Sequence, residues 1–286
     1  MSNGPPGKRW RTWARVAGLL VAFYLVIRWF EHYQVYHPYR AWAADGSALG
    51  GAWEDVSFTA PDGVRLSGWF FPARTNSRRA QVAVLVCHGN GGNISHRLGL
   101  YSVLLEAGVN VFALDYRGYG RSAGRPGEEG TYLDAQAACS WLRQRGFVTT
   151  NLVAYGESLG GAVVTELALR ESLGGLVLQS TFTSIPDLGA ELFPWLPVRA
   201  LVTLRYETER KLPQVRVPVL ILHSRADGLV SFRHAQRNWA AANPPKWLVE
   251  IDGDHNDPLE LSRDKIVAGL DQLTPLVSAG RRDVAH

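Results

Sequence analysis

Two serines stand in the pattern Gly-x-Ser-x-Gly, which places a nucleophilic serine on a sharp turn between a strand and a helix. Ser122 lies in GRSAG at 120–124, and Ser158 lies in GESLG at 156–160. Because 29 of the 286 residues are glycine, one such match can arise by chance. The residues around each serine must therefore decide which of the two can attack a substrate.

Ser158 has the surroundings that the turn requires. It follows the apolar run NLVAYG and precedes LGGAVVTELALRE, in which apolar residues recur at helical spacing. We expect Gly156, Gly160 and Gly161 to permit a tight turn with positive φ and close packing of the new helix on the strands. The N-terminus of that helix would stabilise negative charge beside the serine. Ser158 is therefore the predicted nucleophile.

Ser122 lacks these surroundings. The strand pattern before it ends at Asp115, and Pro126 and Gly127 follow it where a helix should begin. We predict that Ser122 lies in a flexible, polar loop after a strand and takes no part in the chemistry.

A serine hydroxyl becomes a good nucleophile when a histidine, oriented by a carboxylate, takes its proton. In a sheet of this kind the chain order is serine, acid, histidine. Asp227 follows the apolar run PVLILHS, and His255 follows WLVEID, so both are loop residues at strand ends in the required order. Each has a plainer alternative, a simple turn for the aspartate and a solvated surface loop for the histidine.

Acyl transfer also needs hydrogen-bond donors for the oxyanion of the tetrahedral intermediate. The run QVAVLVC leads into HGNGGN at 88–93, whose glycines free the backbone to point N–H groups into a site. We expect the backbone N–H groups of Asn90 and Leu159 to form this oxyanion hole. The alternative for HGNGGN is an ordinary glycine turn.

The elements that must position these residues form a mostly parallel sheet. A hairpin is predicted first, from 53–59 and 64–71 around a Pro-Asp-Gly turn. Six short apolar runs rich in β-branched residues follow, separated by helical stretches, as in β-α-β crossovers. These runs are 81–87, 109–115, 151–156, 174–180, 218–224 and 247–252. Catalytic groups in such a sheet lie at the carboxyl ends of the strands.

The net charge of +4 comes from the N-terminus. The first fifteen residues hold four cations, Lys8, Arg9, Arg11 and Arg15, and the rest of the chain carries 26 basic and 26 acidic residues. A nucleic-acid-binding protein would spread basic residues over a folded face, so we predict no nucleic-acid partner.

The cations precede an apolar run, VAGLLVAFYLVI at 16–27. Flanking arginines can snorkel and flanking aromatic residues suit a membrane interface, so we predict an uncleaved single-pass anchor. A cleaved signal peptide and a helix lying on the membrane surface are the alternatives. The positive-inside rule would place the catalytic domain on the non-cytoplasmic side, although Arg28 and Arg40 on the other flank weaken this assignment.

The remaining motifs are few. Cys87 and Cys139 lie in strand and helix patterns and are expected to be buried thiols. The sequence has no cysteine or histidine spacing of a metal site and no phosphate-binding glycine motif between a strand and a helix. We therefore expect neither a metal nor a cofactor.

The motifs HGNGGN, DYRGYGRS, YGESLGG, STFTSIPDL, SRADGLV and GDHND, in this order, resemble the α/β-hydrolase superfamily. More narrowly, the chain resembles its membrane-anchored, Bem-type members over about residues 32–270. The resemblance implies an eight-stranded fold, a Ser158–Asp227–His255 triad and serine hydrolase activity. It narrows the class of reaction and leaves the substrate open.

We accordingly predict four parts of the chain. They are a basic N-terminus and membrane anchor (1–31), a linker (32–52), an α/β-hydrolase catalytic domain (53–275) and a flexible tail (276–286). A small lid is expected at about 182–215, between the sixth and seventh strands. Its aromatic residues Phe193, Trp195 and Tyr206 are expected either to line an acyl pocket or to pack in the ordinary way.

The predicted function is that of a membrane-tethered serine hydrolase, which cleaves an ester or thioester of a small or lipid-like acyl substrate. One alternative is a serine peptidase of the prolyl-aminopeptidase or oligopeptidase type. It would need an acidic group for the substrate amine, such as Glu157 or Glu191. Another is a catalytically silent membrane scaffold on the same fold.

Overall fold

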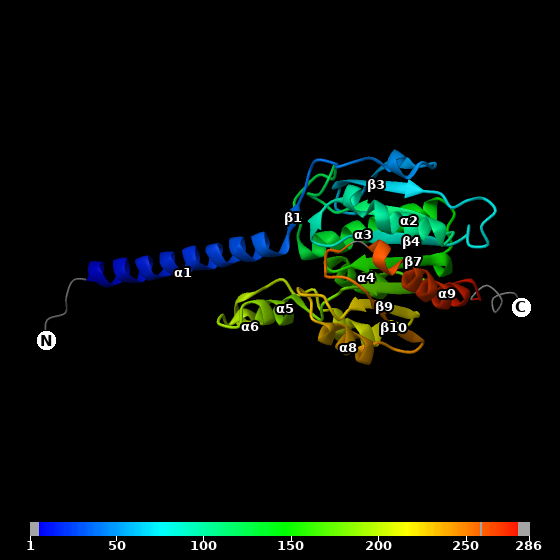
Figure 1. Cartoon of the computed structure of the whole chain (residues 1–286). Coiled ribbons are helices and arrows are strands. Elements are labelled where there is room, and N and C mark those ends of the chain that lie inside the picture. The colour runs from blue at the N-terminus through cyan, green and yellow to red at the C-terminus, as the bar shows by residue number, and fades with distance from the viewer. Residues whose placement is uncertain (1–5, 258, 280–286) are drawn as a thin grey trace, which may run out of the picture.

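The computed structural model describes residues 6–257 and 259–279. A long N-terminal helix, α1 (Pro6–Val35), projects from an α/β body that contains the rest of the described chain (Figure 1). The predicted tail begins inside the last helix, α9 (Arg263–Ala279), and its remaining residues, 280–286, lie outside the described residues.

An eight-stranded sheet forms the centre of the body, in the order β10-β9-β8-β7-β4-β6-β3-β2. Only β2 with β3 and β3 with β6 pair antiparallel among the described strands of this sheet, and the other neighbours are parallel. The strands are β2 (Glu54–Thr59), β3 (Arg65–Phe71), β4 (Ala83–Cys87), β6 (Asn110–Asp115), β7 (Leu152–Glu157), β8 (Gly175–Gln179), β9 (Val219–Ser224) and β10 (Lys246–Ile251). The predicted mostly parallel, eight-stranded sheet with an antiparallel start is confirmed.

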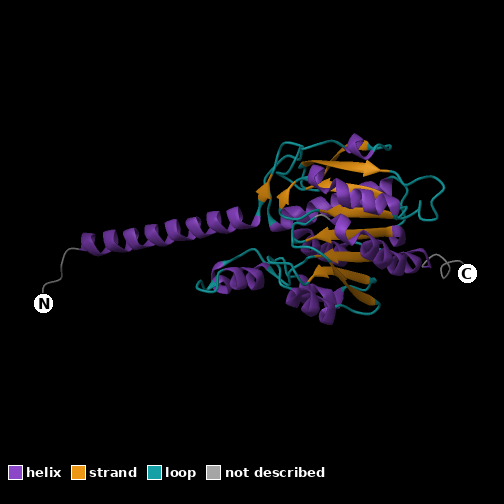
Figure 2. Ribbon diagram, viewed as in Figure 1, coloured by secondary structure: helices purple, strands orange, loops and turns teal. Residues whose placement is uncertain are grey.

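Helices cover both faces of the sheet (Figure 2). The strands are apolar on both sides, so alternate residues of β4 enter different cores: Leu85 packs with one and Val84 with the other. The first core includes residues of α3 (Glu128–Gln144), α4 (Leu159–Arg170) and α8 (Phe232–Ala241), and the second includes residues of α2 (Leu98–Glu106) and α9. Full burial of each large apolar side chain contributes about 1.5–3 kcal/mol, so these cores hold the strand ends in fixed positions.

Between β8 and β9 the chain forms three short helices, α5 (Ile185–Leu192), α6 (Val198–Leu201) and α7 (Thr208–Lys211). Ser184 begins α5 because its side chain accepts a hydrogen bond from the N–H of Asp187, and a proline lies in the first turn. In Figure 1, α5 and α6 lie beyond the body on the side from which α1 projects. Short 3₁₀ turns complete the chain at Gly46–Leu49, Ile94–Arg97, Thr149–Asn151, Leu212–Gln214 and Leu259–Ser262.

The helix α1 has the length and composition of a membrane span from Trp10 to Val35, and its most apolar window has a mean hydropathy of 1.5. Its apolar side chains are exposed, which distinguishes it from the core helix of a globular domain; they include Leu19, Leu20, Phe23 and Val26. The helix ends at Val35, beyond the predicted end of the anchor at residue 31.

The segment that follows α1 is attached to the body. Strand β1 (His37–Pro38) pairs in parallel with β5 (Gly91–Gly92), which lies in the loop after β4. The backbone N–H of His37 donates to the carbonyl oxygen of Asn90 at 3.0 Å, and that of Tyr39 donates to Gly92 at 3.1 Å. The stretch predicted as a linker therefore begins with the last turn of α1, and its next residues are fixed to the loop predicted to form the oxyanion hole.

Candidate active site

Ser158 lies on the turn between β7 and α4, at the N-terminal end of the helix. Its φ of 51° and ψ of −112° are unusual for a residue with a side chain, and such strain is characteristic of a nucleophile elbow. The sequence predicted positive φ for the neighbouring glycines, and this detail is wrong, because Gly156, Gly160 and Gly161 are not among the positive-φ residues.

The glycines serve close packing instead. A Cβ on Gly160 would lie 1.9 Å from the carbonyl oxygen of Cys87 and 2.8 Å from that of His88. A Cβ on Gly156 would lie 2.3 Å from the carbonyl oxygen of Gly160. Only glycine lets α4 start this close to β4, so these residues fix the position of Ser158 over the end of the sheet.

The three residues predicted as a triad lie in hydrogen-bonding contact. His255 Nε2 is 3.1 Å from Ser158 Oγ, and His255 Nδ1 is 2.8 Å from Asp227 Oδ2. With a carboxylate at Nδ1, that nitrogen carries the proton and Nε2 is free to accept the serine proton. Asp227 and His255 lie in the loops after β9 and β10, as their sequence positions predicted.

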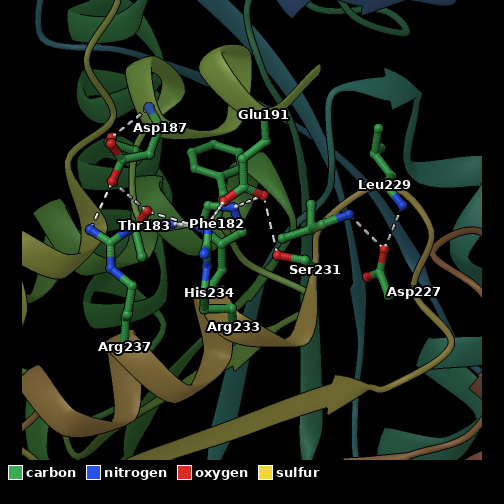
Figure 3. Close-up of polar contacts among 12 residues, drawn as sticks. Phe182, Thr183, Asp187, Glu191, Asp227, Leu229, Ser231, Arg233, His234 and Arg237 are labelled. Carbon is green, nitrogen blue, oxygen red and sulfur yellow. Dashed lines mark hydrogen bonds and ion pairs between the residues drawn. The ribbon is translucent and has the colours of Figure 1, made fainter. Parts of the chain in front are cut away.

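The carboxylate of Asp227 is held in its ionised form. Its Oδ1 accepts a hydrogen bond from the N–H of Leu229 at 3.0 Å (Figure 3). It accepts a second from the N–H of Val230 at 2.7 Å. Burial alone would raise the pKa of Asp227, but the hydrogen bonds from His255 and the Val230 backbone outweigh it and hold this pKa below its ordinary value. An ionised Asp227 keeps the imidazole of His255 in the tautomer that can accept a proton from serine.

A second aspartate, Asp254, joins the two loops and was not among the predicted site residues. Asp254 Oδ1 accepts from the N–H groups of Gly228 and His255, both at 2.7 Å. It therefore ties the loop of the predicted acid to the loop of the predicted base. Its position beside His255 in GDHND was the signal available in the sequence.

The two predicted oxyanion donors border the same cavity as Ser158. Leu159 is the first residue of α4, where an N–H has no partner within the helix, and Asn90 lies in the loop after β4. His88 Nδ1 lies 2.6 Å from the carbonyl oxygen of Gly89, which orients the peptide that carries the Asn90 N–H. Tyr119 Oη also donates to the Asn90 carbonyl, at 2.8 Å, so this loop is supported from several sides.

Ser122 lies in a loop after β6, as predicted, but the loop packs against the sheet at this residue and is not the open polar loop that was expected. The side chain is fully buried; its Oγ donates to the carbonyl of Asp115 at 2.6 Å and accepts from the N–H of Ser67 at 2.8 Å. These two bonds join the end of β6 to β3. Proline and glycine nearby indicated an exposed loop, but long-range contacts with the sheet edge bury it.

The surroundings of Ser158 differ in polarity on two sides. An apolar groove with a free volume of about 170 Å³ is bordered by Ser158, Leu159 and Asn90 at one end and by side chains of α1, α5 and α6. A separate polar hollow is bordered by Ser158, His255, Asn256 and Arg97.

Of the three aromatic residues singled out in the sequence for the predicted lid, one borders the groove, one packs in the ordinary way and one does neither. Phe193 borders the apolar groove. Tyr206 is fully buried and packs in the ordinary way, with its hydroxyl 2.9 Å from that of Tyr36 and 3.0 Å from Thr131 Oγ1. Trp195 is mostly exposed and does not border the groove.

The acidic residues considered for binding a substrate amine are already paired. Glu157 receives two hydrogen bonds from the Arg97 guanidinium, both at 2.9 Å. Glu191, on α5, contacts Arg233 at 2.7 Å and His234 Nε2 at 3.2 Å. Figure 3 shows this second network beside the loop of Asp227, where it also reaches Ser231. Neither carboxylate is therefore available without the loss of an ion pair.

The same network fixes α5 and the residues before it to α8. His234 Nδ1 accepts from the N–H of Thr183 at 3.1 Å, and Arg237 binds Asp187 at 2.8 Å (Figure 3). Burial lowers the pKa of His234, so the ring is neutral and can donate to Glu191 through Nε2 while it accepts through Nδ1. The start and the end of α5 are thus both held.

The fold and this arrangement define a class of protein, the α/β hydrolases with a serine on a nucleophile elbow. Comparison with known proteins agrees. Residues 78–207 match the family model described as "Serine aminopeptidase, S33". The uncharacterized protein Rv2307c of Mycobacterium tuberculosis is 38% identical over 246 residues, which cover 85% of this chain and 87% of the relative.

Two further relatives carry descriptive names. The alpha/beta hydrolase domain-containing protein WAV2 of Arabidopsis thaliana is 32% identical over 266 residues, or 84% of this chain and 86% of the relative. Protein bem46 of Schizosaccharomyces pombe is 32% identical over 185 residues, or 62% of each chain. Among solved structures, an esterase of Pyrococcus furiosus, Pf2001, superposes with a TM-score of 0.67 at 22% identity and covers 84% of this chain and 98% of its own.

The chain belongs to the α/β-hydrolase family. The predicted resemblance, the fold and the assignment to the serine hydrolases are confirmed at this level.

Proposed function

We propose that this chain is a membrane-tethered serine hydrolase that cleaves a carboxylic ester or thioester through Ser158, His255 and Asp227. The observation that carries the proposal is the continuous contact from Ser158 Oγ to His255 Nε2, and from His255 Nδ1 to an ionised Asp227. The apolar groove beside the serine supports an acyl substrate.

The first half of the reaction forms an acyl-enzyme. Ser158 Oγ attacks the carbonyl carbon while its proton moves to His255 Nε2, and Asp227 stabilises the resulting imidazolium. The N–H groups of Asn90 and Leu159 donate to the oxyanion of the tetrahedral intermediate. The bond to the leaving group then breaks as His255 returns the proton to the leaving oxygen or sulfur.

The second half releases the acid. His255 takes a proton from water, whose oxygen attacks the acyl carbon, and the proton returns to Ser158 Oγ as the acyl-enzyme bond breaks. The products are a carboxylic acid and an alcohol or thiol, and the enzyme is regenerated.

Labelling with a fluorophosphonate tests this assignment. We expect the wild-type protein and the Ser122→Ala variant to react covalently, and the Ser158→Ala variant to remain unlabelled. Equal labelling of wild type and Ser158→Ala would overturn the proposed triad.

A peptidase is the second candidate, because the matching family model carries an aminopeptidase description. The pairing of Glu157 with Arg97 and of Glu191 with Arg233 speaks against a free anionic site for a substrate amine. Turnover of p-nitrophenyl esters compared with that of aminoacyl anilides separates the two. A protein that hydrolyses neither, yet folds, would be the silent scaffold.

We also propose that α1 spans the membrane as an uncleaved anchor, with the catalytic domain on the non-cytoplasmic side. Four cations precede the apolar run, Lys8, Arg9, Arg11 and Arg15, against Arg28 and Arg40 after it, and this excess of Lys and Arg supports the orientation. Protease accessibility of the catalytic domain in sealed right-side-out and inverted membrane vesicles tests the orientation.

A further inference from the structure

The apolar groove beside Ser158 has one wall made by the membrane helix itself. Ile27, Phe30 and Val35 of α1 border it on one side, and Leu188 and Leu192 of α5 border it on another. The ring of Phe30 meets that of Phe193 at 6.1 Å between centroids, so the end of α1 and the lid are in contact. Anchoring alone does not require α1 to border a cavity that Ser158 also borders, so this contact points to a role for α1 in substrate binding.

The groove and the polar hollow meet the serine from different sides, and His255 borders only the hollow. In ester cleavage the group that receives the proton of His255 is the leaving oxygen. The alcohol part of the substrate must therefore lie on the side of His255, in the polar hollow. The acyl chain then occupies the apolar groove.

The groove is continuous with the surface that α1 offers to a bilayer. One residue before Ile27, Val26 is 58% exposed, and Phe23 is equally exposed. Such a run of exposed apolar side chains on one long helix is typical of a segment that lies in a lipid bilayer. A hydrocarbon chain in the bilayer can thus reach the groove along α1 without crossing water.

Hydrogen bonds hold this wall in place. Glu31 of α1 is buried, and its Oε1 accepts from the N–H groups of Thr203 and Leu204, both at 2.7 Å. The guanidinium of Arg28 donates to the carbonyl of Leu201 and to Thr203. The segment after α6 is therefore fastened to α1, which keeps the groove between them.

From these observations we infer that the groove between α1 and the lid is an acyl-chain site, and that the substrate is a long-chain fatty acyl ester of a polar alcohol, drawn from the bilayer. The inference rests on the proposed hydrolase function and specifies its substrate class. The acyl chain lies along Ile27 and Phe30, its carbonyl lies at Ser158, and the alcohol lies beside His255.

Substitution at neighbouring positions of α1 tests the groove in the full-length protein. Ile27→Trp should partly fill it, whereas Val26→Trp places the same bulk on the exposed surface of the helix and serves as the control. We expect Ile27→Trp to lower the ratio of kcat/KM for p-nitrophenyl palmitate to that for p-nitrophenyl butyrate by about tenfold or more, since misfit of a few methylenes has effects of this size. Val26→Trp should keep the wild-type ratio. An unchanged ratio in Ile27→Trp would overturn the inference.

Two isomeric esters test which side each part of the substrate occupies. Methyl palmitate has its long chain on the acyl side, and pentadecyl acetate has it on the alcohol side. In detergent micelles, the full-length protein should hydrolyse methyl palmitate with the higher kcat/KM. The reverse order would overturn the assigned orientation.

Failure of the inference and failure of the proposed function give different results. If the wild-type protein reacts with a fluorophosphonate and hydrolyses butyrate esters but shows no preference for palmitate, the function stands and the acyl-chain site is refuted. If it reacts with no fluorophosphonate and hydrolyses no ester of any chain length, both are refuted.

Discussion

Glu31 and Thr203, which are 172 positions apart in the sequence, are joined by a hydrogen bond of 2.7 Å from the Thr203 N–H to Glu31 Oε1. This contact fastens the last turn of α1 to the segment that follows α6, within the predicted lid. The next residue of the lid, Leu204, donates to the same oxygen. The helix and the lid therefore form one structural unit, and a protein truncated at residue 32 would lose this connection.

The first prediction concerns that connection. Glu31→Ala leaves the partly buried N–H groups of Thr203 and Leu204 without their acceptor, at a cost below the about 1–3 kcal/mol of a fully buried unpaired group. We expect faster amide hydrogen exchange at 198–206, whereas the strands of the sheet keep their protection. Tyr33→Ala, a change at an exposed position on the same helix, should leave exchange in the lid unaltered. Equal exchange in the lid of wild type and Glu31→Ala would show that the contact does not hold this segment.

The second prediction concerns the elbow. In Gly160→Ala the new methyl group would lie 1.9 Å from the Cys87 carbonyl oxygen. Because that oxygen belongs to the backbone of β4, the clash can be relieved only by a shift of β4 or α4. Overpacking of this kind costs about 1–3 kcal/mol or more, so we expect a lower Tm and weaker fluorophosphonate labelling. Gly51→Ala has no atom within 4 Å of its added methyl group and serves as the control. A Gly160→Ala variant with wild-type Tm and labelling would contradict the close packing.

The third prediction separates Ser122 from Ser158. Ser122→Ala removes a donor to Asp115 and an acceptor for Ser67, and buried groups left unpaired cost about 1–3 kcal/mol in the free energy of unfolding. Urea denaturation should show this loss, while the folded variant keeps its labelling rate. Loss of labelling with unchanged stability would instead give Ser122 a role in the chemistry.

Local sequence patterns were sufficient for the sheet and for the order of the site residues. Each predicted strand run overlaps a strand of the structure, and Ser158, Asp227 and His255 lie in the loops that follow strands, because apolar β-branched runs and glycine turns are local signals. The position of the positive φ was not predicted correctly, because Ser158 has the positive φ. The three glycines are required by close packing, Gly160 against Cys87 of β4, Gly156 against the start of α4 and Gly161 against Thr181.

The parts that the sequence did not predict depend on contacts between distant residues. Three such contacts join segments with no shared local pattern. They are the pairing of β1 with β5, the hydrogen bond from the Gly228 N–H to Asp254, and the contact of α1 with the groove. Ser122 illustrates the same limit, because a loop rich in glycine is exposed or buried according to what packs on it. Its burial was decided by β3, 55 residues earlier.

The last prediction concerns Arg97 and Glu157, next to the nucleophile. In the wild-type protein burial would raise the pKa of Glu157, but the charge and hydrogen bonds of Arg97 outweigh it and lower this pKa. A carboxyl group whose pKa is lower in the folded state than in the unfolded chain stabilises the fold at every pH above its unfolded pKa, which is about 4.3. This stabilisation is lost only as the pH falls from there through the folded-state pKa. The Arg97–Glu157 pair should therefore cause no change with pH in the free energy of unfolding of the wild-type protein between about pH 5 and 8.

In Arg97→Met the largely buried Glu157 carboxylate loses its cation, and burial should raise its pKa above the unfolded value. A raised carboxyl pKa means that the folded state binds the proton more tightly, so stability falls as the pH rises. We expect a loss of about 3–5 kcal/mol at neutral pH, as for a broken buried ion pair, and a smaller loss near pH 5. Urea denaturation at several pH values measures both. The double variant Arg97→Met/Glu157→Gln has neither charge of this pair, so it should regain much of the stability and lose the pH dependence. If the single variant Arg97→Met is less stable than the wild type by the same amount at every pH, this account is refuted.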